Sequence, residues 1–298
     1  KVLSYNYGTT GGLNDMIGRV DNISETGQTL ESYSYLGVGT VVIRNENQTG
    51  MSLTYVKQSG ESNGDAGDQY TGLDLFGRVV DQRWINSGGT AVDRYQYIFD
   101  RDSNVVTKTN LLHTAFNEAY TYDGLNRLTA TTRNGSAYQS WSLDALGNML
   151  SITDSSGTTT RTYNDQNQLT AIGSSSLAYD NNGNTITDDQ GHTLIYDAWN
   201  RLIQVKDGST NLETYSYDGT GRQISENNWR ATGLTLNIYY SSQWQAIEER
   251  LGSSDVEIQN VFSIGYVDSP ILRDEDFNND GSFSTSERTY LTQDANFN

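Results

Sequence analysis

A seven-residue pattern recurs along the middle of this chain and limits what the chain can fold into. Its clearest copy is YDGLNRL, from Tyr122 to Leu128. Each copy has a large apolar or aromatic residue first, Asp or Asn second, Gly, Asn or Ser fifth, and Arg, Asn or Gln sixth. The copies begin at Leu73, Phe99, Tyr122, Leu143, Tyr163, Tyr179, Tyr196 and Tyr217. They lie 16 to 26 residues apart, and a period near 20 indicates a repeat architecture.

Each copy has the chemistry of a β-hairpin turn. An Asp at the first turn position accepts hydrogen bonds from backbone N–H groups two and three residues further on. Gly or Asn tolerates the positive φ of a type I turn that runs into a G1 bulge. The flanking residues alternate, as in AYTYDGLNRLTATT from Ala119 to Thr132. We therefore predict hairpin turns that begin at Asp74, Asp100, Asp123, Asp144, Asn164, Asp180, Asp197 and Asp218.

The composition also favours strands. Among 298 residues there are 29 Gly and 20 Tyr but one Pro, and only 35% of the residues are hydrophobic. So small an apolar fraction suits a thin sheet with two wetted faces better than a deep core. The sequence therefore predicts an all-β fold of repeated antiparallel β-hairpins, in which strands pair from one hairpin to the next.

The repeat resembles that of the YD-repeat, or Rhs (rearrangement hotspot), family, whose unit reads roughly Y-x-Y-D-x-x-G-R-L. The best copies are YTYDGLNRL from Tyr120 and YSYDGTGR from Tyr215. The departures from the family unit are Leu73, Phe99 and Leu143 for Tyr, Asn164 for Asp, and Asn104, Asn148, Gln168 and Asn184 for Arg. In toxin-complex C components, wall-associated proteins and teneurins the repeats wind into a spiral, often a hollow shell. The resemblance implies such a spiral or shell-like sheet here.

We expect three segments along the chain. Residues 1–72 form irregular N-terminal hairpins of the same sheet, residues 73–223 form the YD-repeat hairpins, and residues 224–298 form C-terminal strands with a calcium-loop insertion. In the first segment, SGESNGDAGD from Ser59 to Asp68 is typical of a surface loop. A cation held by Glu61, Asp65 and Asp68 is the less favoured alternative.

Charge excludes some classes of partner. The formal net charge is −18, from 19 Lys and Arg against 37 Asp and Glu. Nucleic acids and anionic membranes attract positive surfaces, so we expect neither as a partner, whereas divalent cations suit this chain. No run of 18 apolar residues predicts a membrane span, and the absence of Cys excludes a disulfide framework.

The strongest chemical motif is DFNNDGSFSTSE, from Asp276 to Glu287. It matches the EF-hand loop template D-x-[DN]-x-[DN]-G-x5-E at every specified position, with Gly281 at the sharp turn. The predicted calcium ligands are side-chain oxygens and one backbone carbonyl. They are Asp276, Asn278, Asp280, the carbonyl of Ser282, Ser284 directly or through water, and Glu287 with both oxygens.

No helix-forming sequence flanks this motif. The sequence therefore predicts a calcium loop between two strands, and the alternative is an acidic turn that binds no ion. Asp274 and Glu275 lie next to the loop, and we expect their negative charge to raise its affinity for Ca²⁺.

The Arg residues that end the best repeats have two interpretations. Arg78, Arg127, Arg201 and Arg222 can stack on a neighbouring Tyr or pair with an Asp of the next hairpin, which is a structural role. A ladder of Tyr and Arg that binds carbohydrate or peptide is the functional alternative.

No pattern in the chain indicates catalysis. His113 and His192 are the only histidines, and neither has a neighbour at the spacing of a zinc site or a catalytic motif. We therefore expect a segment that is not an enzyme. The resemblance implies that self-cleavage machinery, where a family member has it, follows YLTQDANFN from Tyr290, which resembles the start of the last family hairpin with Asp294 at the Asp position.

Two functions fit these features. The first is a structural segment of a secreted or cell-surface protein, a β-spiral shell that encloses or displays another part of the polypeptide. Its partners would be the remainder of the same polypeptide or other copies, reached through strand edges. The second is an extracellular adhesion module that binds glycans or partner proteins. The chain starts at Lys1 without Met, so we expect it to be a piece of a longer protein.

Overall fold

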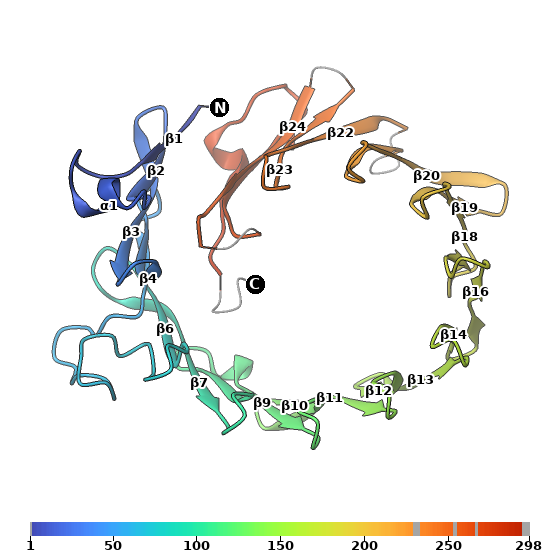
Figure 1. Ribbon diagram of the computed structural model, residues 1–298, viewed down its shortest axis with the longest axis horizontal. Helices are drawn as coiled ribbons and strands as arrows, with labels where there is room; N and C mark the ends of the chain where they lie inside the picture. The colour runs from blue at the N-terminus through green and yellow to red at the C-terminus, as the bar shows by residue number, and fades with distance from the viewer. Residues whose placement is uncertain (1, 229–232, 253–254, 266–267, 294–298) are drawn as a thin grey trace. The chain divides into compact units, whose positions relative to one another are not determined.

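A computed structural model describes residues 2–228, 233–252, 255–265 and 268–293. The chain forms two compact units. Unit 1 consists of Lys1–Ala137, Val261–Leu272 and Tyr290–Asn298, and unit 2 of Tyr138–Asn260 and Arg273–Thr289. The described residues are almost all strand or turn (Figure 1), with one short α-helix, α1 (Leu13–Met16), and two 3-10 turns, Thr114–Phe116 and Thr285–Glu287. The predicted all-β fold is confirmed.

Strands pair with their neighbours in sequence, and every register that the structure gives is antiparallel. The first sheet has 15 strands in the order of the chain. They are β1 (Leu3–Asn6), β2 (Asn22–Glu25), β3 (Gln28–Leu36), β4 (Thr40–Glu46), β5 (Met51–Thr54), β6 (Asp81–Ile85), β7 (Ala91–Phe99), β8 (Val105–Asn110), β9 (Glu118–Tyr122), β10 (Leu128–Arg133), β11 (Ser136–Leu143), β12 (Met149–Asp154), β13 (Gly157–Tyr163), β14 (Leu169–Ile172) and β15 (Ser175–Ser176).

The second sheet has 11 strands, again in chain order. They are β16 (Ala178–Tyr179), β17 (Thr185–Thr187), β18 (Thr193–Tyr196), β19 (Leu202–Asp207), β20 (Thr210–Tyr217), β21 (Gln223–Asn227), β22 (Thr235–Tyr240), β23 (Ala246–Leu251), β24 (Asp255–Phe262), β25 (Pro270–Glu275) and β26 (Arg288–Tyr290). The three sequence segments at 1–72, 73–223 and 224–298 divide the chain differently from the two compact units and stay a prediction.

The two sheets meet in one extended segment of unit 2. β15 pairs with β14, and β16, which begins two residues after β15 ends, pairs with β17. Between them Leu177 donates its N–H to the carbonyl of Thr170 over 2.9 Å. The Tyr179 hydroxyl donates to the carbonyl of Leu169 over 2.7 Å. β15 and β16 are therefore parts of one extended strand. It bonds to β14 along its first part and to β17 along its second, and so links the two sheets.

The turn at Asp123 shows how the repeat motif works. One carboxylate oxygen, Oδ1, accepts the N–H of Leu125 at 2.9 Å and of Arg127 at 3.0 Å, two and four residues further on. The prediction of two and three residues was wrong, because the third N–H, of Asn126, donates to the backbone carbonyl of Asp123 instead. Asn126 has the predicted positive φ, +60°, and the pairing of β9 with β10 shifts register further along, between Leu128 and Ala130.

All eight predicted turns share this arrangement. In each, the first residue accepts N–H bonds from the second and fourth residues after it, and the third has positive φ. Three further turns follow the same scheme although their sequences did not match: they begin at Asn86, Asp188 and Ser241. Asn and Ser there supply the acceptor oxygen that Asp supplies elsewhere.

The Arg at the end of a repeat pairs with the carboxylate of the Asp in its own turn, and not with the carboxylate of the next hairpin's Asp as the sequence suggested. Arg201 Nε donates to Asp197 Oδ2 over 2.7 Å. Its guanidinium also stacks on Tyr217 of the following repeat, 4.9 Å from the ring centroid. An Arg four residues after the Asp reaches back to it more easily than across to another strand, so the pair closes the turn.

Asn takes over the role of Arg in several copies. Asn104 Nδ2 donates to Asp100 Oδ2 over 2.9 Å and to Asn126 Oδ1 of the next turn over 3.0 Å. Asn184 joins Asp180 to Asn200 in the same way. These departures from the family unit therefore still link successive turns.

At five turns the Tyr before the first turn residue joins its hairpin to the one before it. Tyr122 OH donates to the carbonyl of Val105 over 2.8 Å, and Tyr217 OH donates to that of Leu202 over 2.7 Å. In each case the acceptor lies five residues after the Asp of the preceding turn. Tyr163, Tyr179 and Tyr240 make the equivalent bond. The hydroxyl explains why Tyr, and not only an apolar residue, suits this position.

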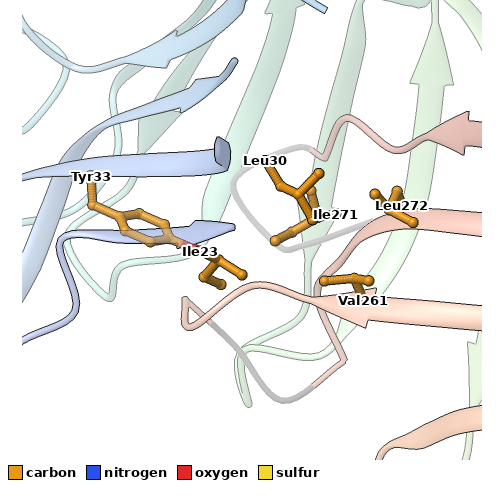
Figure 2. Packing of buried hydrophobic residues seen from close by; sticks show 6 residues of the cluster. All are labelled: Ile23, Leu30, Tyr33, Val261, Ile271 and Leu272. Atoms are coloured by element: carbon orange, nitrogen blue, oxygen red, sulfur yellow. The ribbon is translucent and has the colours of Figure 1, made fainter. Parts of the chain in front are cut away.

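The buried apolar side chains of unit 1 come from both ends of the chain. Figure 2 shows that side chains from β2 and β3 meet those of β24 and β25 in one cluster: Ile23, Leu30, Tyr33, Val261, Ile271 and Leu272. Each such side chain contributes roughly 1.5–3 kcal/mol through burial. In unit 2, by contrast, none of the strands from β12 to β21 contains a fully buried residue, so polar turn contacts have a larger role there.

We predict that the turn pair Asp123 and Arg127 can be exchanged for Asn and Gln only together. The Asn164 turn is the natural precedent, because Asn164 Nδ2 donates to Gln168 Oε1 over 2.7 Å. Asp123→Asn alone would set its amide N–H against the Arg127 N–H groups, so the urea midpoint should fall. Adding Arg127→Gln supplies an acceptor and should restore most of the loss. A double variant no more stable than Asp123→Asn would refute this account of the turn.

Candidate functional site

The predicted calcium loop lies in unit 2, between β25 and β26. Its first and last ligands, Asp276 and Glu287, are buried, at 3% and 4% exposure. The backbone N–H of Asp276 donates to the carbonyl of Glu257 in β24 over 2.9 Å. The residues between them are largely exposed, so the loop projects from a fixed base.

The carboxylate of Asp276 organises the first half of the loop. Its Oδ1 accepts the N–H of Asp280 at 3.1 Å, and its Oδ2 accepts the N–H of Gly281 at 2.7 Å. Gly281 has φ +77°, a conformation that side chains rarely adopt. The sharp turn predicted at this position is therefore present.

The next two ligands lie in the exposed part of the loop. Asn278 Oδ1 accepts the N–H of Asp280 at 2.8 Å. Asp280 Oδ1 accepts the side-chain hydroxyl of Ser282 at 2.6 Å and its N–H at 2.9 Å, and these donors lower the pKa of the Asp280 carboxyl. Each side chain keeps lone pairs that no backbone donor uses.

Glu287 closes the loop as part of a capping box. Its Oε2 accepts the N–H of Ser284 at 2.9 Å and the hydroxyl of Ser284 at 2.7 Å, and the pKa of the Glu287 carboxyl is lowered chiefly by that N–H. Its Oε1 lies 3.4 Å from the N–H of Asn278. Ser284, predicted as a ligand, thus also caps the 3-10 turn at Thr285–Glu287.

The carboxylates of Asp276, Asp280 and Glu287 accept backbone N–H groups of the loop itself. In the part of the chain that the structure describes, no three Asp, Glu, His or Cys side chains gather as a group that could hold a metal ion. Binding would require Asp276, Asp280 and Glu287 to turn their remaining lone pairs toward one point. The residue types fit Ca²⁺, which prefers oxygen ligands in flexible geometry. The six predicted ligands stay a prediction.

The acidic neighbours of the loop carry their own cations. Asp274 binds the Arg288 guanidinium through two hydrogen bonds of 2.8 Å. Glu275 pairs with Arg273 at 3.0 Å. The extra negative field expected from Asp274 and Glu275 is therefore largely cancelled. The sequence did not reveal this, because one pair joins two strands and the other lies along a single strand.

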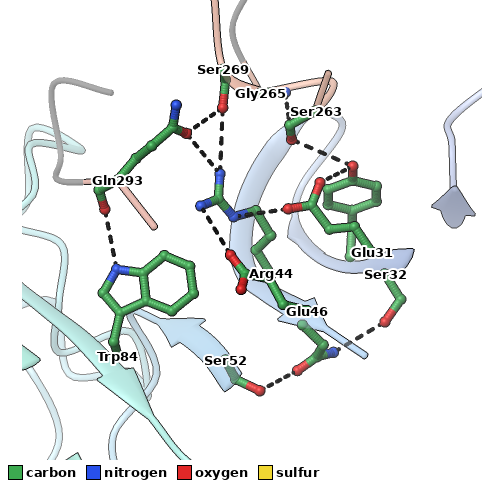
Figure 3. A network of polar contacts seen from close by, with 12 residues as sticks. Glu31, Ser32, Arg44, Glu46, Ser52, Trp84, Ser263, Gly265, Ser269 and Gln293 are labelled. Carbon is green, nitrogen blue, oxygen red and sulfur yellow. Dashed lines mark hydrogen bonds and ion pairs between the residues drawn. The ribbon is translucent and has the colours of Figure 1, made fainter. Parts of the chain in front are cut away.

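A second cluster of charged side chains is buried in unit 1. Arg44 Nε lies 3.0 Å from Glu31 Oε1, and Arg44 Nη2 lies 4.0 Å from Glu46 Oε1 (Figure 3). All three residues are at most 4% exposed. Tyr33 donates its hydroxyl to Glu31. Burial raises the pKa of the Glu31 carboxyl and raises that of Glu46 to about 7.

This cluster fastens Gln293 to the N-terminal strands. The carbonyl of Gln293 accepts Gln82 Nε2 at 2.7 Å and the indole N–H of Trp84 at 3.1 Å (Figure 3). Its side-chain Oε1 accepts Arg44 Nη1 at 3.2 Å and the hydroxyl of Ser269. Residues more than 200 positions apart are thus joined by buried polar bonds. The family hairpin predicted from Tyr290 onward has its Asp294 outside the described residues.

The acidic stretch from Ser59 to Asp68 contains an ion-pair partner. Glu61 Oε2 lies 2.7 Å from Arg83 Nη1, and Asp68 Oδ1 accepts the N–H of Tyr70 at 2.8 Å. These contacts fit the favoured interpretation as a surface loop. Arg83 of β6 holds the loop at Glu61.

Neither histidine lies in a recognisable catalytic arrangement. His192 is the fifth residue of the Asp188 turn, and its Nδ1 lies 2.9 Å from Asp188 Oδ2, in the place of the repeat Arg. His113 is exposed, with its ring edge-on to Phe116.

No described helix is long and apolar enough to cross a membrane.

The sequence of the chain matches a model of a known protein family. The model described as Teneurin YD-shell matches residues 4–250, which is most of the chain. The chain belongs to the Teneurin YD-shell family. As a YD-shell chain it matches two curated relatives, the tRNA nuclease WapA of Bacillus subtilis and the tRNA3(Ser)-specific nuclease WapA of Bacillus spizizenii. Each is 32% identical over 133 residues, covering 41% of this chain and 6% of the relative.

Solved structures share the YD-shell fold at low identity. The Photorhabdus luminescens Tc holotoxin pore matches 92% of this chain and 14% of its own chain, with TM-score 0.62 and 16% identity. The TcdB2–TccC3 crystal structure matches 86% of this chain and 14% of its own, also with TM-score 0.62 and 16% identity. The chain thus spans a small part of the length of each protein it matches.

We predict that unit 1 loses stability as the pH rises from about 4.5 to 7. The raised pKa of Glu46 means that the folded state holds a proton that the unfolded state releases, so the stabilisation is complete below the unfolded pKa and is lost through about 7. Buried Glu31, which faces the same Arg44, acts in the same direction. For Glu46 the loss should be on the order of 3 kcal/mol.

Urea unfolding of wild type and Glu46→Gln at several pH values would test this. The variant keeps the acceptor for Thr49 but cannot ionise, so its midpoint should fall less between pH 4.5 and 7. Asp102→Asn, an exposed change in unit 1, serves as the control and should behave like wild type. Equal losses in Glu46→Gln and wild type would contradict the assignment.

Proposed function

We propose that this chain forms part of the wall of a YD shell that encloses or displays another part of the same polypeptide. The observation that carries the proposal is the linkage of successive hairpins. Five turns bind the next turn through an Arg or Asn side chain, and five Tyr hydroxyls bind the preceding hairpin. Such nearest-neighbour contacts suit a continuous wall. Family membership supports the same role.

Strand edges are the proposed route to the rest of the polypeptide. β1 and β26 are terminal in the sheet orders, so each offers backbone groups to a further strand. The partner would be the remainder of the same polypeptide or another copy. The matched relatives are far longer than this chain, which leaves room for enclosed or displayed parts.

We infer no catalytic role for this segment. The two relatives named as tRNA nucleases are matched over 6% of their length, so their activity is not transferred to it. The role of His192 in a turn supports a structural interpretation. A secreted or cell-surface location belongs to the proposal and rests on the family. Adhesion to glycans or proteins is the second candidate function.

Protease protection in the natural polypeptide that carries this chain would test the shell. Enclosed parts should resist digestion while the wall is folded. Arg201→Ala, which removes the contacts to Asp197 and to the carbonyl of Asp218, should loosen the wall and speed their digestion. Leu146→Ala changes an exposed side chain and serves as the control. Equal digestion in wild type and both variants, at the rate of the unfolded protein, would contradict enclosure.

We also propose that the Asp276–Glu287 loop binds one calcium ion. The complete match to the template supports it, as do the positive φ of Gly281 and the buried base at Asp276 and Glu287. Calcium would draw the carboxylates together and fix the connection between β25 and β26. The two strands in place of helices favour an ordering role over that of a sensor that opens.

Calcium titration by calorimetry should distinguish a calcium loop from an acidic turn. Glu287→Gln removes a charge from the closing ligand, and Gly281→Val strains a residue at φ +77° without touching a ligand. Each should weaken Ca²⁺ binding by about tenfold or more. Asp207→Asn removes an exposed charge elsewhere in unit 2 and should change nothing. Failure of wild type to bind at about 1 mM Ca²⁺ would refute the site.

A further inference from the structure

The pairing of β17 with β18 is the thinnest in unit 2. Thr187 opposite Thr193 is the single residue pair in register, fewer than in any other register that the structure gives for unit 2. By contrast, β12 and β13 pair at four positions. Neither β17 nor β18 contains a fully buried residue, so side-chain burial adds little to hold the two strands together.

The Tyr bond that joins other hairpins is also missing between these strands. Five Tyr hydroxyls donate to a carbonyl of the preceding hairpin, five residues after its first turn residue. At the same spacing Tyr196 would donate to the carbonyl of Thr185. Among the described residues, however, the Tyr196 hydroxyl donates no hydrogen bond. The hairpin that begins with β18 is therefore attached to β17 less firmly than other hairpins are to their predecessors.

Side chains close this pairing at the border that carries the repeat turns. Asn182 Nδ2 donates to Asn200 Oδ1 over 3.2 Å, and Asn184 Nδ2 donates to the same oxygen over 2.9 Å. We call these three residues the Asn clasp. Asn182 and Asn200 are exposed, so water competes for their hydrogen bonds and the clasp can open.

The opposite border holds a turn that is closed by its own bonds. Asp188 Oδ1 accepts the N–H of Gln190 at 3.0 Å and of His192 at 2.8 Å, and Asp188 Oδ2 lies 2.9 Å from His192 Nδ1. This turn keeps β17 and β18 joined when they separate elsewhere. The two strands therefore form a fork, with a fixed turn at one end and the Asn clasp at the other.

We propose that this fork is the point at which the unit 2 sheet opens, and that the Asn clasp holds it shut. Opening the fork breaks one residue pair and two side-chain hydrogen bonds. Opening between β12 and β13 breaks four pairs, the Tyr163 bond to Met149 and the Asn148 bond to Asn167. Because local opening is easiest where the fewest bonds and the least buried area are lost, the fork opens more often.

The opened fork has a different surface from the closed sheet. Separated strands each present backbone N–H and C=O groups along an unpaired edge. The opening itself does not depend on what the shell encloses. Its consequence rests on the proposed function: in a wall of linked hairpins, the fork is the place that yields first, while the turn at Asp188 keeps the two sides connected.

Hydrogen exchange of the 298-residue chain under native conditions, resolved along the chain by NMR or mass spectrometry, tests the fork. After correction for the intrinsic rate of each amide, β17 and β18 should exchange about tenfold or more faster than β12 and β13. Equal corrected rates in the two pairs of strands would mean that unit 2 opens only as a whole, which would overturn the proposal.

Two matched variants test the clasp. Asn200 and Asn167 have φ of +61° and +66°, and Oδ1 of each accepts an Asn side chain of the preceding repeat turn. Asn200→Gly keeps the backbone conformation and removes the clasp, so exchange in β17 and β18 should rise about fivefold or more. Asn167→Gly removes the equivalent bond elsewhere in unit 2 and should leave exchange in β17 and β18 within about twofold of wild type.

The comparison separates local opening from a general loss of stability. If β17 and β18 exchanged only when all of unit 2 unfolds, both variants would raise their exchange by the same factor, and the fork would be refuted. No rise in Asn200→Gly would refute the clasp. Circular dichroism checks that each variant is folded. None of these results bears on the shell, which is tested by protease protection.

Discussion

A carboxylate that accepts three hydrogen bonds at the start of a turn is the interaction on which this fold depends. In the Asp123 turn one oxygen holds two backbone N–H groups and the other holds the Arg127 side chain. These hydrogen bonds satisfy backbone N–H groups that neither strand can reach. They also fix where the side-chain alternation of one strand stops and that of the next strand begins. Because the strands from β12 to β21 bury no residue fully, the sheet there depends on these turns and on the Tyr hydroxyls more than on a core.

Unit 1 is held together by a different kind of contact. Its apolar cluster brings Val261, Ile271 and Leu272 onto the first strands of the chain, and its Arg44 cluster brings Gln293 there. Two buried carboxylates lie beside one guanidinium, and burial raises the pKa of both. A buried arrangement of this kind adds little net stability by itself, but a mismatched segment would leave charges without partners. The Arg44 cluster therefore specifies that the segment with Gln293, and no other, lies against the first strands.

The sequence predicted what is local and missed what is distant. Turn positions, left-handed residues and bulges follow from a few adjacent side chains, so all eight turns were found. The alternation of Leu234 to Glu249 predicts a hairpin around Ser241 to Gln243, and the turn there uses the Ser241 hydroxyl as the acceptor in place of an Asp carboxylate. Gln293 could not be connected to Arg44, 249 positions away, because no periodic pattern links them. The calcium loop was found as a motif, but ligand types and spacing do not fix whether the oxygens converge.

The linked turns make one border of the sheet uniform and leave the other free to vary. In a sheet of strands in chain order, successive connections alternate between borders, so the seven predicted repeat turns from Asp100 to Asp218 lie on one side, and the Asp188 turn between β17 and β18 lies on the other. Differences in length, such as the residues between β8 and β9, fall on the opposite side. A gene of this kind can therefore gain or lose whole hairpins by duplication or deletion, and each added hairpin meets a neighbour that already presents the complementary contacts.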